Sequence, residues 1–338
     1  MQDVPFFIVG TERSGSNLLR LILDSHPRIV IPHPPHVMRY FSPLVAHYGD
    51  LHDPQRFRAL VDDVLALVHA HIHPWPSVPN AEAVIARCEQ RDLLAVYGAV
   101  HELARDASGK ARWGCKSTFM MHHADAVLER WPDARLLWLY RDPRDVAASS
   151  RESVFSTFHP AYTARLWSGQ QTLGLAVERA HPANTLRIRY ESLVAAPELE
   201  VRRICEFLGE EFHPKMLQWF KGAEAKRSAG LSESWSNTAA PMREDRLERW
   251  RRDLAVADVK AVESIAGVTM AALDYERVTP ASSAAATGFT ELRWWFVDRW
   301  LWAKVELRSM RRDKNVWRRW KRAMLLWRIR ARLALRGT

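Results

Sequence analysis

The amino-acid sequence predicts an α/β fold of three layers, in which a central parallel sheet is flanked by helices, followed by a basic, tryptophan-rich helical extension. Two observations support this prediction. The 338 residues are 47% hydrophobic and 26% charged, the balance of a globular protein with a full core. Short apolar runs alternate with segments of helical periodicity, and strands that alternate with helices form parallel sheets covered on both faces.

Four segments have the pattern of strands. The first, FFIVG at 6–10, is closed by glycine and followed by the helical pattern LLRLIL. WGCK at 113–116 is a shorter strand candidate. The run ARLLWLY at 134–140 leads into RDPRDVAASS, which becomes helical. The alternating segment NTLRIRYESL at 184–193 precedes an amphipathic helix that starts near Pro197. The order strand, loop, helix therefore recurs along the chain.

Positive charge is concentrated at the end of the chain. Residues 291–338 contain fifteen Lys or Arg against four Asp or Glu, a segment charge of +11, whereas the whole chain carries +10. Seven of the fifteen tryptophans also lie there, and a turn-prone stretch, TPASSAAATG, precedes them. We therefore expect a globular domain at 1–278, a linker at 279–290 and a basic amphipathic helical tail at 291–338.

The sequence favours a cytoplasmic protein. Its three cysteines are odd in number, widely spaced and without a CxxC pair, which argues against a disulfide framework and a zinc site. The first residues lack the pattern of a secretory signal, and no run of eighteen apolar residues predicts a spanning helix.

The loop after the first strand reads GTERSGSN at 10–17. Glycines between a strand and a helix let the backbone curl, so that free amide groups face an anion at the helix start. A loop that binds nucleoside triphosphates has Lys directly after the second glycine and then Ser or Thr for magnesium. Here Ser16 and Asn17 occupy those places, and the cation is Arg13 inside the loop. The sequence thus predicts a P-loop-like fold that binds a phosphate-like ligand other than ATP.

Three segments carry a family resemblance. The run PFFIVGTERSGSNLLRLILDSHP resembles the 5′-phosphosulfate-binding loop of sulfotransferases that use 3′-phosphoadenosine 5′-phosphosulfate (PAPS), especially the protein-tyrosine and bacterial branches. LLWLYRDPRDVAASS resembles the family's 3′-phosphate motif, an Arg that ends a strand and a Ser eight residues later, here Arg141 and Ser149. IRYESLVAAPELEVRRICEFLG is similar to the segment whose tyrosine, here Tyr190, reaches the adenine. With a weaker match at REDRLERWRRDL, the resemblance covers roughly residues 5–250.

The resemblance implies which residues bind PAPS. The sulfuryl group would be held by the loop, through Arg13, Ser14, Gly15, Ser16 and Asn17. An Arg at a strand's end and a Ser two helical turns later can converge on one phosphate, with paired charge-assisted hydrogen bonds from the Arg. The alternative for Arg141 is a surface ion pair with Asp142 or Asp145.

The resemblance also implies catalytic groups. Lys116, at the end of the WGCK strand, matches a family lysine that contacts the sulfuryl group or the leaving oxygen; the alternative is a solvated loop lysine. In many relatives a Glu base follows the first helix by about ten residues, and the aligned position here is Pro34. His33 and His36 flank it, and an imidazole suits proton abstraction at neutral pH. We favour His33 slightly over His36, and for each the alternative is packing against aromatic neighbours.

The expected activity is in-line transfer of a sulfuryl group from PAPS to a hydroxyl acceptor, with a His base and no metal. The acceptor is expected on a lipid, a glycolipid or another hydrophobic small molecule. Two alternatives stay open. One is a non-enzymatic adaptor with a vestigial nucleotide fold, and the other is a nucleotide kinase of related fold, which Ser16 and Asn17 disfavour.

The tail has the composition of a helix that lies on a membrane. Placed on a helix, Trp317, Trp320 and Trp327 share one face, and most basic side chains point elsewhere. Tryptophan at headgroup level with Lys and Arg beside anionic phosphates is typical of a peripheral helix on the inner membrane face. The alternative is a helical hairpin that packs on the body or on a second copy in a homo-oligomer. Nucleic acid is disfavoured because residues 1–290 are nearly neutral.

Overall fold

The structure is a computed structural model that describes residues 4–151, 153, 158–231, 235, 238–280, 288–313 and 315–336. Its centre is a five-stranded sheet in the order β2-β3-β1-β4-β5, in which every neighbouring pair is parallel. The strands are β1 (Phe6–Gly10), β2 (Ile29–Val30), β3 (Arg112–Lys116), β4 (Arg135–Tyr140) and β5 (Thr185–Arg189). The predicted parallel sheet is confirmed, and the two-residue β2 is the strand that was not predicted.

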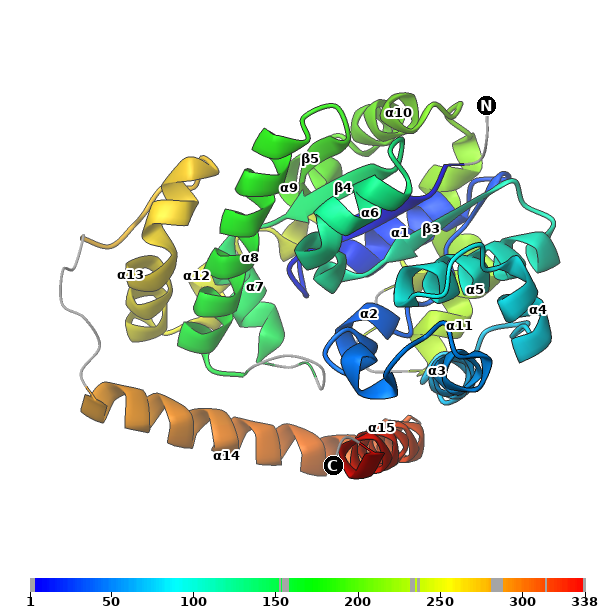
Figure 1. Ribbon diagram of the computed structural model, residues 1–338. Coiled ribbons are helices and arrows are strands. Elements are labelled where there is room, and N and C mark those ends of the chain that lie inside the picture. The colour runs from blue at the N-terminus through cyan, green and yellow to red at the C-terminus, as the bar shows by residue number, and fades with distance from the viewer. Residues whose placement is uncertain are drawn as a thin grey trace.

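The α-helices cover both faces of this sheet (Figure 1). They are α1 (Ser16–Asp24), α2 (Val37–Phe41), α3 (Pro54–His69), α4 (Ala81–Arg87), α5 (Leu93–Ser108), α6 (Ala124–Arg130), α7 (Pro143–Ser150), α8 (Pro160–Ala180), α9 (Tyr190–Ala195), α10 (Pro197–Leu208), α11 (Ala223–Leu231), α12 (Trp250–Asp253), α13 (Val256–Ala272), α14 (Gly288–Arg312) and α15 (Val316–Arg336). Short 3₁₀ helices lie at Val45–Tyr48, Thr118–His123, Pro214–Lys221 and Glu244–Arg246.

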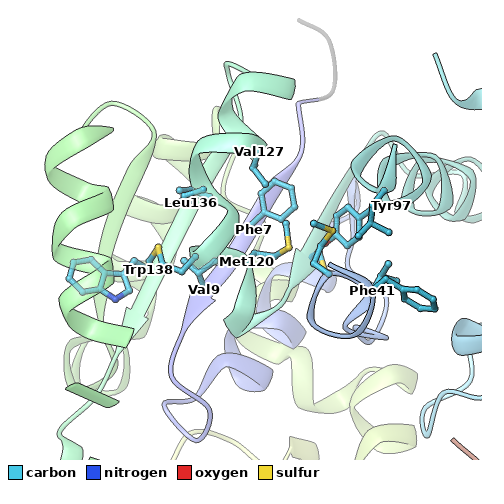
Figure 2. Close-up of a cluster of buried hydrophobic side chains, with 14 of the residues drawn as sticks. Phe7, Val9, Phe41, Tyr97, Met120, Val127, Leu136 and Trp138 are labelled. Atoms are coloured by element: carbon cyan, nitrogen blue, oxygen red, sulfur yellow. The ribbon is translucent and has the colours of Figure 1, made fainter. Parts of the chain in front are cut away.

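The alternation of side chains along β1 divides the core into two layers. Phe7 and Val9 point to one face, where they pack with side chains of α3, α5, α8 and α13. Figure 2 shows this cluster, with Trp138 of β4 and Tyr97 of α5 at its two sides. Phe6 and Ile8 point to the opposite face and pack with side chains of α1 and α10. The sheet is buried on both faces, as the continuous apolar strand sequences predict.

Local sequence signals fix the helix after β4. Asp142 is the N-cap of α7, and its carboxylate accepts a hydrogen bond from the amide of Arg144 at 2.8 Å. Pro143 occupies the first helical turn, where no amide donor is needed. The Asp142 carboxylate also pairs with the Arg144 guanidinium at 2.7 Å. This cap holds Arg141, the residue between β4 and α7, at the edge of the sheet.

The basic tail forms two helices that lie against the body. Figure 1 shows α14 along one side of the molecule and α15 beside α3. Leu326, Ile329 and Leu333 of α15 are buried in the larger core cluster. The carboxylate of Asp298 in α14 accepts hydrogen bonds from the amides of Phe158 and His159 at 3.0 and 2.9 Å. Residues 281–287 of the predicted linker lie outside the described residues.

Candidate active site

The predicted site residues meet at the edge of the sheet where the strands end. A cavity of about 780 Å³ lies there, a size suited to a nucleotide and a second substrate. Part of its wall comes from the end of β3 and from the segments that follow β1, β2, β4 and β5, the usual binding position in a parallel α/β sheet. Of the predicted residues, it includes Arg13, Gly15, Ser16, Asn17, His33, His36, Lys116, Arg141, Ser149 and Tyr190. Ser14 belongs to the loop after β1, but its side chain is fully buried and does not line the cavity.

The loop between β1 and α1 is curled by left-handed backbone conformations. Arg13 has φ +68° and Gly15 has φ +92°. Gly15 is the N-cap of α1 and provides no side-chain cap, so the first amides of the helix are available to an anion. The hydroxyl of Ser14 and the side-chain amide nitrogen of Asn17 are buried without a hydrogen-bond partner among the described residues. Oxygen atoms of a bound phosphosulfate would satisfy donors of this kind.

Two sequence motifs that are far apart in the chain meet at Arg13. Its Nε donates a hydrogen bond to the Ser149 hydroxyl at 3.1 Å, across 136 residues of sequence. The loop after β1 and the helix after β4 are thus joined at the cavity wall. A ligand with an anionic group at each end could contact both segments at once.

The Tyr190 ring lies close to both Arg141 and Gly15. The Arg141 guanidinium lies 4.4 Å from the centroid of the Tyr190 ring. A Cβ on Gly15 would lie 2.4 Å from Tyr190 Cδ2, so only glycine admits the ring at this distance. Arg141 also donates to the Asp145 carboxylate at 3.2 Å, which is the ion pair considered as its alternative role. Its Nε is nevertheless buried without a partner in the described chain, which leaves a donor for a phosphate.

Lys116 ends β3 inside the cavity. Burial lowers the pKa of its ammonium group to about 8, and the nearby Glu12 carboxylate opposes this effect. Glu12 lies 3.6 Å from Arg39 and is the one carboxylate among the described residues of the cavity wall. Glu12 was not among the predicted site residues, although it is the acidic member of the glycine-rich loop.

The His33 ring is enclosed by other rings. It stacks on His73 at 5.1 Å and lies 5.0 Å from His71 and 4.6 Å from Trp235, measured between centroids. Both ring nitrogens are buried, and neither has a hydrogen-bond partner within the described parts of the chain. Burial, followed by the charge of His71, lowers the pKa of His33 well below its usual value. His71 and His73 carried no motif and were not predicted.

His36 occupies a strained backbone position at the start of α2. Its φ is +59°, an uncommon value for a residue other than glycine that often marks functional sites. Its Nδ1 is buried and has no partner in the described structure. Burial, followed by the charges of Lys116 and Arg322, lowers the pKa of His36 well below its usual value. The imidazole is therefore neutral at pH 7.

The segment after the 3₁₀ helix Glu244–Arg246 closes another side of the cavity. The Asp145 carboxylate accepts hydrogen bonds from the amides of Glu248 and Trp250 at 3.0 and 3.1 Å. This docking brings Arg246 and Arg249 to the cavity wall. The REDRLERWRRDL stretch, whose resemblance was weak, thus contributes to the site.

The cavity is strongly cationic. Its described wall includes these positively charged residues: Arg13, Arg39, Lys116, Arg141, Arg243, Arg246, Arg249, Arg308 and Arg322. The last two belong to the tail helices α14 and α15, which the sequence did not place at the site. Within the described residues, no group of three or more His, Cys, Asp or Glu side chains could hold a metal ion. The chemistry of the wall suits a polyanionic ligand.

Comparison with known proteins identifies the family. Residues 5–214 match the sulfotransferase family. The chain belongs to the sulfotransferase family. Two solved sulfotransferase domains share its fold at 20% identity: one from the curacin biosynthetic pathway, with a TM-score of 0.54 over 82% of this chain and 99% of that domain, and one from the Synechococcus PCC 7002 olefin synthase, with a TM-score of 0.53 over 82% and 97%.

Curated relatives of this sulfotransferase-family chain are distant. Protein-tyrosine sulfotransferase A of Caenorhabditis elegans is 23% identical over 278 residues, which are 78% of this chain and 65% of that protein. Nodulation protein NoeE of Sinorhizobium fredii is 23% identical over 301 residues, 80% and 66% of the two chains. An uncharacterized protein of Aquifex aeolicus is 23% identical over 257 residues, 73% of this chain and 30% of that one. The chain spans less than two thirds of each of these relatives.

Proposed function

We propose that this protein transfers a sulfuryl group from PAPS to a hydroxyl acceptor. The observation that carries the proposal is the hydrogen bond from Arg13 to Ser149. This bond joins the proposed phosphosulfate loop to the proposed 3′-phosphate site, at the edge of the sheet where parallel α/β proteins usually bind their ligands. PAPS has its phosphosulfate and its 3′-phosphate at two ends of one adenosine. The cationic wall and the buried donors of Asn17 and Arg141, both of which line the cavity, support a ligand of this kind.

Each group at the site has a part in the proposed reaction. The acceptor oxygen forms a bond to sulfur while the bond from sulfur to the bridging phosphate oxygen breaks, and 3′-phosphoadenosine 5′-phosphate (PAP) leaves with the electron pair. The acceptor proton passes to a base on the protein. The amides at the start of α1 stabilise the sulfuryl oxygens, and Lys116 stabilises the charge on the leaving oxygen.

A calorimetric comparison of PAP and ATP tests the donor assignment. We expect PAP to bind the full-length protein without magnesium, and Arg141→Gln to weaken this binding by tenfold or more because a charged donor to the 3′-phosphate is lost. ATP binding that requires magnesium would identify a kinase instead. Binding of neither nucleotide would leave the adaptor alternative.

We propose His36 as the base. His36 lines the cavity together with Lys116, and its Nδ1 is buried without a hydrogen-bond partner among the described residues. Of the charges that lower its pKa, that of Lys116 has the largest effect. His33, which the sequence alone favoured slightly, is instead surrounded by three rings. The Glu12 carboxylate also lines the cavity and is a further candidate for the base.

Three single variants separate these candidates. We expect His36→Asn to reduce the transfer of ³⁵S from labelled PAPS to the acceptors in a lipid and metabolite extract by about 100-fold or more, with PAP affinity unchanged. His33→Asn and Glu12→Gln should retain transfer within about tenfold. A 100-fold loss in His33→Asn or in Glu12→Gln, with His36→Asn active, would assign the base to that residue and refute His36.

We also propose that the tail rests on an anionic membrane surface at the cytoplasmic face. Trp317 and Trp327 of α15 are 75% and 67% exposed, although the same helix buries an aliphatic face on the core. Exposed tryptophans within a segment of charge +11 are suited to a surface of anionic headgroups. Two such segments would repel each other if they faced one another in a dimer. No helix within the described residues is long and apolar enough to cross a membrane.

Vesicle flotation tests this surface. The full-length protein should float with phosphatidylglycerol vesicles at low salt and not with phosphatidylcholine vesicles. The double variant Trp317→Ser/Trp327→Ser should float at least fivefold less. Leu199→Ser is the matched control, since Leu199 is 67% exposed on α10, away from the tail. Equal flotation of the double variant and the parent would refute the membrane surface, and so would a stable dimer that stays unbound.

A further inference from the structure

Arg322 of the tail helix α15 reaches into the cavity beside the proposed base. Its Nη2 donates to the carbonyl oxygen of Pro35 at 3.1 Å, next to His36 in sequence. Its guanidinium lies 4.9 Å from the centroid of the Tyr40 ring. Both contacts belong to the segment that contains the two candidate histidines. Arg322 therefore lies at the part of the cavity wall that is formed by the segment after β2.

Arg322 carries a positive charge that no carboxylate of the described residues compensates. No carboxylate in the described parts of the chain forms an ion pair with it, and its Nε is buried without a hydrogen-bond partner. Its pKa is lowered by burial, while the positive charge of Arg39 acts in the same direction. An arginine stays protonated even so, and a partly buried guanidinium without a counter-charge is unfavourable for the protein alone. A bound anion would supply the missing partner.

Arg39 presents a second guanidinium to the same region. It lies 4.1 Å from the centroid of the Phe119 ring, and the His36 ring is 6.2 Å from that ring. The Glu12 carboxylate is 3.6 Å away, a distance too long for a tight hydrogen bond. Arg39 of α2, whose side chain is partly exposed, and Arg322 of α15 thus both contact neighbours of His36, and both line the cavity.

We propose that Arg322 and Arg39 form an anion subsite that binds a phosphate group of the acceptor. The acceptor is then a phosphorylated alcohol, whose hydroxyl is presented to His36 while the two guanidinium groups hold its phosphate. Planar guanidinium groups recognise phosphate through paired hydrogen bonds, which fixes orientation as well as affinity. This inference rests on the proposed sulfotransfer, and it gives the tail helix a role inside the site.

Calorimetry on the full-length protein saturated with PAP tests the subsite, because PAP fills the donor site and keeps phosphate probes out of it. Glycerol 3-phosphate is the soluble probe, and glycerol is its uncharged counterpart. We expect the parent to bind glycerol 3-phosphate and not glycerol. Arg322→Gln and, independently, Arg39→Gln should weaken this binding by tenfold or more, whereas Arg322→Lys should retain part of it. Arg330→Gln is the matched control, since Arg330 is exposed on the same helix.

A second pair of probes identifies the source of the phosphate. If the phosphate belongs to a lipid headgroup, transfer of ³⁵S from PAPS to phosphatidylglycerol vesicles, which carry free hydroxyls, should fall at least tenfold in Arg322→Gln and not in Arg330→Gln. If the acceptor is soluble, the same loss appears with glycerol 3-phosphate alone. Either pattern supports the subsite.

Two results would overturn the subsite. One is that Arg322→Gln and the parent bind glycerol 3-phosphate equally well and transfer ³⁵S to phosphatidylglycerol equally fast. The other is a loss of PAP affinity in Arg322→Gln as large as that in Arg141→Gln, which would place Arg322 in the donor site. A parent that does not bind PAP would instead refute the proposed function, so the two failures are distinguishable.

Discussion

The protonation of Lys116 gives a quantitative test of the donor site. Burial lowers the pKa of this lysine to about 8 in the free protein. A polyanion such as PAP binds the protonated lysine, and its charges raise the pKa again in the complex. The affinity for PAP should therefore be constant below about pH 8 and should fall as the pH rises above that value, where the free protein loses the proton and the complex retains it.

The magnitude follows from linkage between protonation and binding. Each pH unit above the pKa of the free lysine raises the Kd for PAP about tenfold, or by about 1.4 kcal/mol. At pH 9 the Kd should thus be about tenfold higher than at pH 7. Neighbouring groups do not titrate in this window, because the pKa of Cys115 is raised to about 12 and those of His71 and His73 are lowered to about 3. Burial likewise lowers the pKa of His36 well below its usual value.

Calorimetric titration with PAP between pH 7 and pH 9.5, in two buffers of different ionisation enthalpy, measures both the Kd and the proton uptake. The parent should take up about half a proton per PAP at pH 8 and more at pH 9. Lys116→Met should bind more weakly at pH 7 and show neither effect. A parent affinity that is constant from pH 7 to pH 9, or an unchanged slope in Lys116→Met, would show that Lys116 does not contact the donor.

Three further substitutions have defined outcomes. Gly15→Ala adds a side chain at positive φ, which costs about 1–2 kcal/mol, and its Cβ would lie 2.4 Å from the Tyr190 ring, so calorimetry should show PAP binding at least tenfold weaker. Ser149→Ala removes the hydroxyl that accepts a hydrogen bond from the Arg13 guanidinium. PAP binding should weaken about tenfold, and the urea midpoint of unfolding should change little. Glu263→Gln should lower the free energy of unfolding in urea by about 3–5 kcal/mol, because Glu263 is buried and pairs with Arg144 at 2.7 Å. Full stability in that last variant would contradict the role of this pair.

The sheet and the residues proposed to bind the donor could be predicted because their signals are local. Each strand that forms the centre of the sheet is an apolar run closed by a glycine or a basic residue, and the chemistry follows directly in the next few positions. Arg141 comes after β4, and Tyr190 comes after β5. Since the ends of parallel strands meet at one edge, the order of the motifs already brings these side chains together. The strand β2 has two residues, too few for a periodic signal.

The rest of the site depends on packing between distant segments. His71 and His73 follow the end of α3 in a stretch without a motif. Both rings contact the His33 ring, and His71 lines the cavity. Arg322 lies 287 residues after its partner Pro35. Arg322 is surrounded in sequence by other basic residues of an amphipathic helix. The periodicity of that helix does not predict which of its arginines lines the cavity.

The geometry of α15 links the two proposals about the tail. Residues two apart on an α-helix project about 200° apart, so Trp320 and Arg322 point to opposite sides. Trp320 is half exposed, whereas Arg322 lines the cavity. A helix that rests on headgroups with its indoles would therefore present Arg322 to the site from the membrane side. Trp317→Ser/Trp327→Ser should then reduce transfer to vesicle-borne phosphatidylglycerol while leaving the binding of glycerol 3-phosphate unchanged, whereas Arg322→Gln should reduce both. If the tryptophan variant lost transfer to phosphatidylglycerol and binding of glycerol 3-phosphate equally, the exposed tryptophans would stabilise the fold of the site. They would then have no separate role in bringing the site to the lipid.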